Sequence, residues 1–314
     1  MTPQMAPTMQ TRCVPYSDEA IAAAAALIEA GQPVAVPTET VYGLAADAMS
    51  DAAVAAIYAA KGRPQFNPLI VHVADAAAAF AIGDFSDAAK ALAAQYWPGP
   101  LTLVVPLRPE SGMAALATAG LPTIGLRVPV HRAMQALLQA TGKPLAAPSA
   151  NASGAISPTQ TKHVLRTLDG RIPLIIDDGP TECGLESTIV AVDGSRIRLL
   201  RAGPVIIEEA ILSVDGAIEA PGQLSAHYAP SKPMRLNATY ACENEDLIGF
   251  GEIGGHWNLS VSGNLIEAAS RLFEMLHRAD ASGSFAIAVA PVPKRGLGIA
   301  INDRLRRAAR GARG

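Results

Sequence analysis

Residues 17–44, which read SDEAIAAAAALIEAGQPVAVPTETVYGL, decide the fold class. Ser17 stands before two acidic residues and an alanine-rich run that Gly31 ends. A hydroxyl N-cap, early acids and a terminal glycine predict a helix. Residues 34–36 (VAV) then predict a short strand, which runs at Pro37 into a polar, hydroxyl-rich turn. A helix followed by a strand with a polar carboxyl end is typical of α/β proteins, which bind ligands at such ends.

The same alternation continues along the chain. Ser50 and Ser86 begin two further helices, which Gly62 and Pro98 end, and residues 157–159 begin another. Further strands are predicted at 69–73, 101–105, 124–128, 145–147, 174–177, 188–192 and 197–200. Interleaved strands and helices predict an α/β or α+β domain built on a mixed sheet.

The chain changes character between residues 213 and 233. This segment contains three prolines and two glycines with little periodicity, which predicts a linker. After it, strands are predicted at 247–250 and 285–290, and helices at 265–276 and 300–309. We therefore predict a first domain over 1–212, a linker over 213–233 and a small C-terminal α/β domain over 234–314.

The composition is that of a folded protein. Half of the 314 residues are hydrophobic, which supplies real cores and excludes disorder as the main state. No apolar run approaches the roughly 18–20 residues of a membrane span. The three cysteines, Cys13, Cys183 and Cys242, form no CxxC pair, which argues against a structural zinc or a disulfide framework. We expect a soluble, cytoplasmic protein without membrane contact.

Charge is unevenly distributed. Residues 294–314 hold seven Lys or Arg and one acid, whereas residues 1–293 carry a net charge of −9. The body is therefore not a general polyanion binder. The basic end is compatible with a weak tRNA contact or with a solvated helix terminus, where cations are favourable.

Two nucleotide-binding signatures are not fulfilled. The sequence contains no GxxxxGK[ST], which excludes a P-loop NTPase. A literal GxGxxG occurs at Gly249, Gly251 and Gly254, but the next helix is predicted only near residue 264. A dinucleotide site needs the helix N-terminus at the glycines, so we expect a glycine-rich loop instead.

Polar side chains follow several predicted strands. The PTETVYGL turn (37–44) offers hydroxyls, and KGRPQFNPL (61–69) places Lys61 and Arg63 on a proline-stiffened loop. These two cations suit a polyphosphate, or they compensate the end of a helix. His72 lies within the apolar strand LIVHV and by itself is typical of a satisfied core residue.

An arginine lies within an apolar predicted strand. Arg127 in IGLRVP has no acidic partner nearby in sequence, which favours a carboxylate ligand. Hydroxyl and amide side chains recur in PSANASG (148–154) and EST (186–188), and LRAG (200–203) adds a cation. No cysteine or acid cluster occurs among these segments. A cationic, hydroxyl-lined site suits a phosphorylated anion better than a tightly ligated metal.

Taken together, these segments resemble the threonylcarbamoyl-AMP synthase family, whose catalytic module is the YrdC-like domain. The matches cover most of residues 15–232 in the family's order: PTETVYGL (37–44), KGRPQFNPLIVHV (61–73), WPGPLTLV (97–104), TIGLRVP (123–129), PSANASGAISPT (148–159), ESTIV (186–190), LRAG (200–203) and HYAP (227–230). The C-terminal unit resembles that of the longer, two-domain form. The resemblance implies a YrdC-like twisted mixed sheet with flanking helices, plus a small Rossmann-like C-terminal domain.

The family's reaction is also implied. It joins L-threonine, bicarbonate and ATP into threonylcarbamoyl-adenylate and pyrophosphate, for modification of the tRNA adenosine beside the anticodon. The carbamate formed from threonine and bicarbonate is already an anionic nucleophile, so its attack on the α-phosphate needs charge neutralisation and positioning. The implied partners are ATP, L-threonine, bicarbonate and the downstream enzymes that transfer the threonylcarbamoyl group to tRNA. Mg²⁺ is expected with ATP, without a protein-ligated metal.

The resemblance assigns residues as well. The threonine site is implied to hold Thr40, His72, Arg127, Ser149 and Ser187, with Arg127 on the carboxylate. The ATP site is implied to hold Arg63, Asn67, Thr123, Asn151, Thr159, Arg201 and Tyr228. Lys61 and Arg63 are the expected catalytic cations, with Lys61 on phosphate or bicarbonate. The linker, which carries Tyr228, is expected to close over the nucleotide, outside both domain cores.

Two other functions compete with this interpretation. A tRNA or double-stranded RNA binding module would use a basic concavity, but the negative body argues against strong non-specific binding. Related domains also occur in hydrogenase-maturation carbamoyltransferases, which carry cysteine-rich zinc segments. Three scattered cysteines argue against that class.

Overall fold

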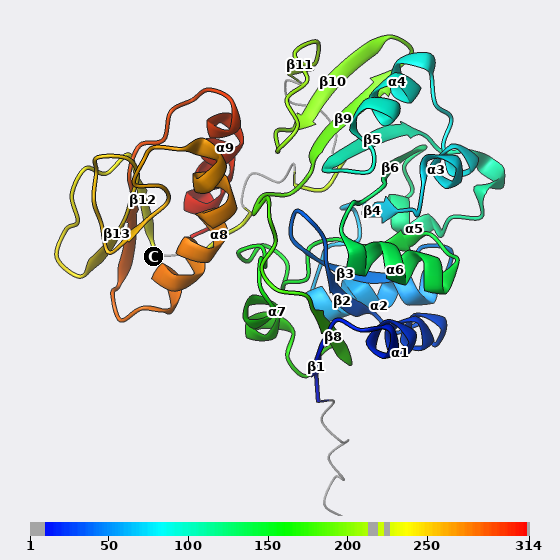
Figure 1. Cartoon of the computed structure of the whole chain (residues 1–314), viewed down its shortest axis with the longest axis horizontal. Coiled ribbons are helices and arrows are strands. Elements are labelled where there is room, and N and C mark those ends of the chain that lie inside the picture. Colours follow the sequence, from blue (N-terminus) through cyan, green and yellow to red (C-terminus); the bar gives the residue numbers. More distant parts are fainter. Residues whose placement is uncertain (1–9, 213–218, 223–226, 313–314) are drawn as a thin grey trace, which may run out of the picture.

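The structure, a computed structural model, describes residues 10–212, 219–222 and 227–312. Two sheets form the centres of two α/β units, which lie side by side (Figure 1). The larger unit comes first in the chain, and the smaller unit comprises the C-terminal segment. The α/β class predicted from the sequence, with a large mixed sheet and a second small α/β unit, is confirmed.

The larger sheet has eleven strands. They are β1 (Arg12–Pro15), β2 (Val34–Pro37), β3 (Tyr42–Asp47), β4 (Ile70–His72), β5 (Leu101–Pro106), β6 (Thr123–Arg127), β7 (Leu145–Ala146), β8 (Leu174–Asp177), β9 (Thr188–Asp193), β10 (Arg196–Arg201) and β11 (Ile211–Leu212). Their spatial order is β1-β8-β2-β3-β7-β4-β6-β5-β9-β10-β11, with parallel and antiparallel pairs mixed.

The helices of the larger unit cover both faces of this sheet. They are α1 (Asp18–Glu29), α2 (Asp51–Lys61), α3 (Ala76–Ile82), α4 (Asp87–Tyr96), α5 (Ala115–Thr118), α6 (Arg132–Thr141) and α7 (Thr161–Leu168), with a 3₁₀ turn η1 (Pro109–Ser111). Neighbours along β2 show the two faces. Val34 and Val36 pack with α1 and α6, whereas Ala35 packs in the cluster that contains α2 and α4. Strands buried on both faces read as apolar runs.

Serine caps begin three helices where the sequence predicts them. The hydroxyls of Ser17, Ser50 and Ser86 each accept a hydrogen bond from the backbone N–H three residues on. Gly62 ends α2 in the left-handed conformation, with φ of 58°. Such caps satisfy backbone groups that a helix leaves open, so they define its ends.

Some elements differ from the sequence prediction. The sequence pattern does not reveal α3, α6 or strand β3, and the helix expected from residues 157–159 begins only at Thr161. Strand β3 pairs antiparallel with β2, so the PTETVYGL turn is a hairpin connection. Tyr42 and Leu44 of this strand are fully buried. The hydroxyl groups of the PTETVYGL segment favour a ligand site, but half of the segment belongs to the hydrophobic core.

The smaller unit is a parallel sheet with two long helices. Its elements are β12 (Met234–Leu236), β13 (Glu245–Gly249), β14 (Trp257–Asn258), α8 (Leu265–Ala281), β15 (Ala286–Val289) and α9 (Leu297–Gly311). The strand order is β12-β15-β13-β14, and every pair is parallel. Figure 1 shows α8 and α9 between this sheet and the larger unit. No described helix is long and apolar enough to cross a membrane.

The predicted linker is described only in part, because residues 213–218 and 223–226 lie outside the described residues. The expectation that residues 227–230 lie outside both cores is wrong. Tyr228 is buried in the apolar cluster of the smaller unit, with its ring centroid 5.6 Å from that of Phe273. Ala229 donates a backbone hydrogen bond to Gly154 of the larger unit. The segment is therefore fastened to both units.

Three loops of the larger unit pack against the smaller one. Val41, Ile156 and Leu185 join the apolar cluster built by α8 and α9. At Gly184 the two backbones touch: a Cβ atom there would lie 2.4 Å from the carbonyl oxygen of Ser270 in α8. Each of these loops neighbours a polar segment that the sequence analysis singled out.

Polar pairs also join α7 to α8. Lys162 and Arg166 pair with Glu274 and Asp280 at 3.1 and 2.8 Å. The rings of His163 and His277 stack with centroids 3.8 Å apart. The two units therefore share an apolar and polar interface.

Candidate active site

Two parallel strands bring the first pair of candidate residues together. Strands β4 and β6 are in register, so that His72 is the partner of Arg127 at their carboxyl ends. Both side chains are buried. Neither ring nitrogen of His72 has a hydrogen-bond partner within the described chain. Burial, and then the nearby Arg127, lowers the pKa of His72 well below its usual value. His72 is therefore a neutral, unsatisfied imidazole, not the satisfied core residue that its strand alone suggests.

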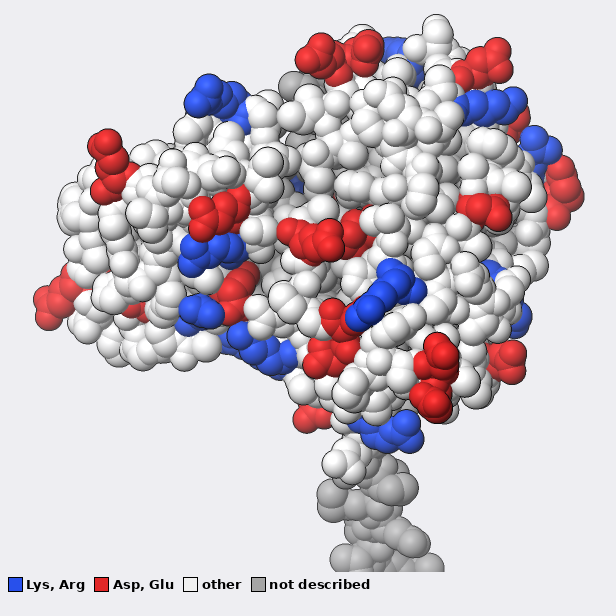
Figure 2. All heavy atoms as spheres, viewed as in Figure 1, with Lys and Arg blue, Asp and Glu red and all other residues white. Residues whose placement is uncertain are grey.

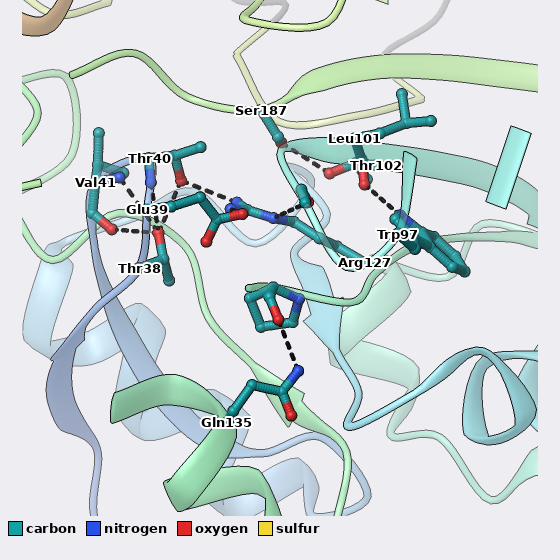
Figure 3. Close-up of polar contacts among 12 residues, drawn as sticks. Thr38, Glu39, Thr40, Val41, Trp97, Leu101, Thr102, Arg127, Gln135 and Ser187 are labelled. Atoms are coloured by element: carbon teal, nitrogen blue, oxygen red, sulfur yellow. Dashed lines mark hydrogen bonds and ion pairs between the residues drawn. The ribbon is translucent and has the colours of Figure 1, made fainter. Parts of the chain in front are cut away.

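The Arg127 guanidinium is already engaged (Figure 3). It donates to the Glu39 carboxylate at 2.6 Å, to the Thr40 hydroxyl at 2.9 Å and to the Gly99 carbonyl at 3.3 Å. Arg127 has no acidic partner nearby in sequence, but it has one in space. Glu39 lies 88 residues away along the chain and contacts the guanidinium. Three of the five N–H groups that an arginine offers are used, and two remain for a ligand.

Hydroxyl groups continue the site on the next strands. The Ser187 hydroxyl lies 2.8 Å from that of Thr102 on β5 and accepts from Arg201 at 3.0 Å. Arg201, at the end of β10, also donates from Nε to the Ser187 carbonyl. Burial lowers the pKa of Arg201, although a buried guanidinium stays charged. The Arg201 guanidinium and the Ser187 hydroxyl are thus held next to each other.

The loop after α2 holds the two predicted catalytic cations differently. The Lys61 ammonium donates to the carbonyls of Ser149 and Asn151, so it fastens their turn. Arg63 donates to the carbonyls of Asn67 and Pro68 and lines the cavity described below. Burial lowers the pKa of Arg63 to about 10, and it lowers that of Lys61 as well. Lys61 therefore fixes the turn at Ser149 and does not line the cavity.

One cavity of about 50 Å³ lies at the junction of these strand ends. Of the predicted residues it is lined by Thr40, Arg63, His72, Arg127, Ser149, Ser187, Arg201 and Tyr228. Linker residues Pro221, Gly222 and His227 form part of its wall. Pockets for small organic ligands usually measure about 300–1,000 Å³. The cavity is partly open, and the free space inside it is smaller than a nucleotide.

Five predicted residues do not line this cavity. Thr123 lines a second, adjoining space that shares Ile70 and Pro221 with the first. Asn67 is buried nearby, and its side-chain amide has no partner among the described residues. The remaining three residues, Lys61, Asn151 and Thr159, are buried outside the cavity wall.

Thr159 lies apart from the others. It contacts His163 and lines a cleft between the two units together with Thr181, Ser270 and Arg271. The structure therefore gathers most of the threonine and ATP residues implied by the resemblance, but not Thr159.

Known proteins match this chain along its length. A family model described as "Telomere recombination" matches residues 26–203, and one described as "Threonylcarbamoyl-AMP synthase, C-terminal domain" matches residues 200–310. The threonylcarbamoyl-AMP synthase of Bacillus subtilis is 38% identical, and the match covers 94% of both chains. The chain belongs to the threonylcarbamoyl-AMP synthase family.

Solved structures agree with this membership. The crystal structure of Pyrococcus abyssi Sua5 complexed with L-threonine has a TM-score of 0.86 and 34% identity, over 96% of this chain and 98% of that one. The threonylcarbamoyl-AMP synthase of the same organism is 37% identical over 91% of this chain. The prediction of a threonylcarbamoyl-AMP synthase with a two-domain fold is confirmed, and the comparisons favour an enzyme over an RNA-binding module.

Two acidic residues that the sequence prediction does not assign to the site lie there. Glu39 and Glu186 are both buried at the site, and the carboxylate of Glu186 contacts Ser157 and Arg304. Both acids stand inside the quoted motifs, PTETVYGL and ESTIV, so their positions were visible. Their partners were not, because these lie 88 and 118 residues away.

The donor set limits how this synthase could hold magnesium. Among the described residues, no group of three or more His, Cys, Asp or Glu side chains is placed for a metal ion. Glu39 Oε2 is buried without a partner in the described chain. A single carboxylate oxygen fits a Mg²⁺ that takes its other ligands from phosphate and water. The residues present therefore fit a magnesium that enters with a nucleotide.

Proposed function

We propose that this protein condenses L-threonine, bicarbonate and ATP into threonylcarbamoyl-AMP and pyrophosphate. Family membership supports the reaction class. The observation that carries the proposal is that one cavity is lined by Arg127 and His72 together with Arg63 and Arg201. A carboxylate and a triphosphate each need cations, and this cavity offers three arginines from different segments of the chain.

The chemistry follows from these charges. The threonine amine adds to bicarbonate with loss of water and gives a carbamate. A carbamate oxygen then attacks the α-phosphorus of ATP, and pyrophosphate leaves. Arg63 and Arg201 stabilise the charge that develops on the phosphate, while Arg127 orients the threonine carboxylate. The nucleophile is anionic before the transfer, so the neutral His72 is not needed as a strong base.

The remaining assignments are part of the same proposal. Threonine is bound by Thr40, His72, Arg127, Ser149 and Ser187; ATP is bound by Arg63, Asn67, Thr123, Asn151, Thr159, Arg201 and Tyr228. Lys61 acts by holding the turn at Ser149, which is the role its hydrogen bonds support. Magnesium is carried by the ATP phosphates. The protein works in the cytoplasm and supplies enzymes that modify tRNA.

The small cavity adds a requirement for this reaction. Tyr228 and Gly222 stand in its wall, and both belong to the predicted linker. A nucleotide is larger than this space, so its binding there requires the wall to move or the nucleotide to extend beyond the cavity. We therefore propose that the linker opens for entry and closes over the adenylate, which excludes water from a labile product.

The test is a pyrophosphate assay with purified protein. ATP, bicarbonate and magnesium are incubated with L-threonine or L-serine, and each component is omitted in turn. Pyrophosphate should form with L-threonine and fall when threonine or bicarbonate is missing. Serine should be the poorer substrate, because one buried methyl group gives about 1–3 kcal/mol of discrimination. Release of ADP and inorganic phosphate instead would contradict the adenylate mechanism.

A further inference from the structure

The last helix of the chain sends one charged side chain toward the active site. Arg304 of α9 is completely buried, although it belongs to the segment that the sequence marks as a basic end. Its Nε donates to Oε2 of Glu186 at 2.9 Å. Glu186 belongs to the larger unit and lines the cavity. This ion pair therefore crosses from the C-terminal unit to the wall of the site.

Glu186 is held on both of its oxygens. Oε2 accepts from Arg304, and Oε1 accepts from the Ser157 hydroxyl. The next residue, Ser187, receives two hydrogen bonds from Arg201, one on its carbonyl and one on its hydroxyl. The position of Glu186 thus determines where a proposed threonine ligand and a proposed ATP ligand stand.

The same helix also contacts the linker wall. The Arg304 guanidinium carbon lies 5.4 Å from the centroid of the Tyr228 ring. One turn later, the Arg307 carbonyl accepts from the backbone N–H of His227 at 3.3 Å. The Tyr228 hydroxyl has no partner within the described chain and lines the cavity. Helix α9 therefore supports two walls of the site through neighbouring residues.

An ion pair buried this deeply is a poor device for stability alone. Removing two charges from water costs about as much as their attraction returns, and apolar replacements of such pairs are often neutral or stabilising. The exposed arginines of α9 differ from Arg304. Arg306 is solvent-exposed and pairs with Asp303 across one helical turn. A buried cation that fixes two walls of one cavity has its main effect on geometry.

We propose that Arg304 is a positioning residue of the active site, which the C-terminal domain contributes by fixing Glu186 and the Tyr228 ring. This inference rests on the proposed function for its kinetic readout. It assigns the C-terminal domain an indirect part in catalysis, through two residues that line the cavity. It also explains why the basic charge at residue 304 is unavailable to RNA.

The experiment compares Arg304→Met with Arg306→Met, a change on the same helix that keeps the wall intact. Pyrophosphate formation gives kcat and the KM for each substrate, and calorimetry gives the ATP affinity. Because Tyr228 and Arg201 lie on the proposed ATP side, Arg304→Met should weaken ATP binding about tenfold and change the KM for threonine less than threefold. Arg304→Lys should recover part of the loss, and Arg306→Met should match the wild type.

The pH profile provides a readout that loss of stability alone does not move. Burial raises the pKa of Glu186, but Arg304 and Arg201 outweigh this and hold it below its usual value. His227, Tyr228 and the Ser157 hydroxyl also face this carboxyl. Without Arg304, the pKa of the Glu186 carboxyl should rise, so the activity of Arg304→Met should begin to fall at a higher pH than that of the wild type. Glu186→Gln combined with Arg304→Met should lose that acid limb.

The outcomes separate the two claims. An active wild type, together with equal ATP affinity and equal pH profiles for Arg304→Met and Arg306→Met, would overturn the positioning role. A wild type that forms no pyrophosphate would overturn the proposed function, while calorimetry with ATP still tests Arg304. Thermal unfolding is measured for every variant. If Arg304→Met does not fold, Arg304→Lys and the charge-free double variant carry the same comparison.

Discussion

Both sheets of the molecule end in glycine- and hydroxyl-rich loops, yet these loops differ in what fills them. At the strand ends of the larger unit, buried polar atoms of His72 and Asn67 have no partner within the described chain, and a cavity lies beside them. In the smaller unit, backbone atoms of the chain itself fill the space beside the glycines of the GxGxxG loop. A Cβ atom at Gly249 would lie 2.2 Å from the carbonyl oxygen of Ile253, and one at Gly255 would lie 2.2 Å from that of Leu247.

The difference shows what identifies a ligand site. The glycines of the smaller unit permit a tight backbone crossing, and no helix N-terminus points at them, since α8 begins only at Leu265. Buried polar groups that are left unpaired cost free energy in the empty protein, and a ligand that pairs them recovers it. Unpaired atoms alone do not mark the site, because Asp246 Oδ2 and Asn258 Oδ1 beside the GxGxxG loop also lack a partner among the described residues. The larger unit combines such atoms with a cavity, so its loops are suited to binding, whereas the glycines of the smaller unit serve packing. Four measurements test this contrast.

The largest effect is expected for the two arginines of the cavity. Arg127→Ala removes a charged hydrogen bond to the threonine carboxylate, worth about 1.5–3 kcal/mol, so threonine affinity should fall roughly 10- to 150-fold. Arg63→Ala should weaken ATP binding more than threonine binding. Calorimetry with each ligand measures both. Equal losses for both ligands in both variants would show that the cavity is not divided in this way.

A smaller effect concerns pH and the interface histidines. Burial lowers the pKa of His163 to about 4 and that of His277 to about 2. The unfolded chain binds protons below about pH 6.5, and the folded chain does not, so stability should fall as pH decreases from 6.5 toward 4. The expected slope is about 1.4 kcal/mol per pH unit for each histidine, which is tenfold in the folding equilibrium.

Urea unfolding at pH 7, 6 and 5 checks this slope. His277→Gln keeps a donor for the Ser157 carbonyl, which lies 3.1 Å from Nε2, but removes the titrating group. This variant should lose less stability on acidification than the wild type. His256→Gln changes an exposed histidine of the same unit and serves as the control. Identical pH slopes for all three proteins would contradict the assignment.

A still smaller effect, on ATP affinity, is expected for Tyr228→Phe. The hydroxyl is buried without a partner in the described part of the chain, so its removal should leave thermal stability unchanged or raise it. ATP affinity should fall about 2- to 13-fold, the equivalent of one neutral hydrogen bond of 0.5–1.5 kcal/mol. Tyr240→Phe, at an exposed position, is the control. Unaltered ATP affinity would remove Tyr228 from the nucleotide site.

The smallest effect is expected for the glycine-rich loop of the smaller unit. Gly251 has φ of +59° and open space around it, so Gly251→Ala should cost about 1 kcal/mol of stability and change kcat/KM less than threefold. Gly222 has φ of +84°, but a Cβ atom there would lie 2.9 Å from the Tyr228 hydroxyl oxygen. Gly222→Ala should therefore lose activity well beyond Gly251→Ala. Similar losses in both variants would erase the contrast between the two loops.

Local signals were enough for much of the fold. Ser17, Ser50 and Ser86 each cap the helix predicted from them, because capping depends on residues a few positions apart. Short apolar runs also located the buried strands. Helices α3 and α6 were missed. Asp75 caps α3 in the ordinary way, so that signal was present in the sequence, whereas α6 begins after His131, which is not a usual cap.

The site was predictable in part for the same reason. Arg127 was recognised because a lone cation in an apolar strand is visible locally. Its pairing with Glu39, and that of Glu186 with Arg304, depends on which loops the fold brings together. Sequence patterns report composition along the chain, whereas ion pairs over such separations arise only from the tertiary structure. The family resemblance supplied the residue list, and the structure supplied the partners.

The contact at Gly184 has a consequence for engineering. The residue combines a left-handed backbone (φ of +66°) with three atoms of α8 within 2.6 Å of where its Cβ would lie, all of them backbone. A single carbon added at this position should push the two units apart, because the atoms that it meets are backbone atoms and cannot rotate away as a side chain can. Alanine, serine and valine at position 184 thus form a graded set of spacers. With them, the distance between the two units becomes a variable that an experimenter sets by the size of one side chain.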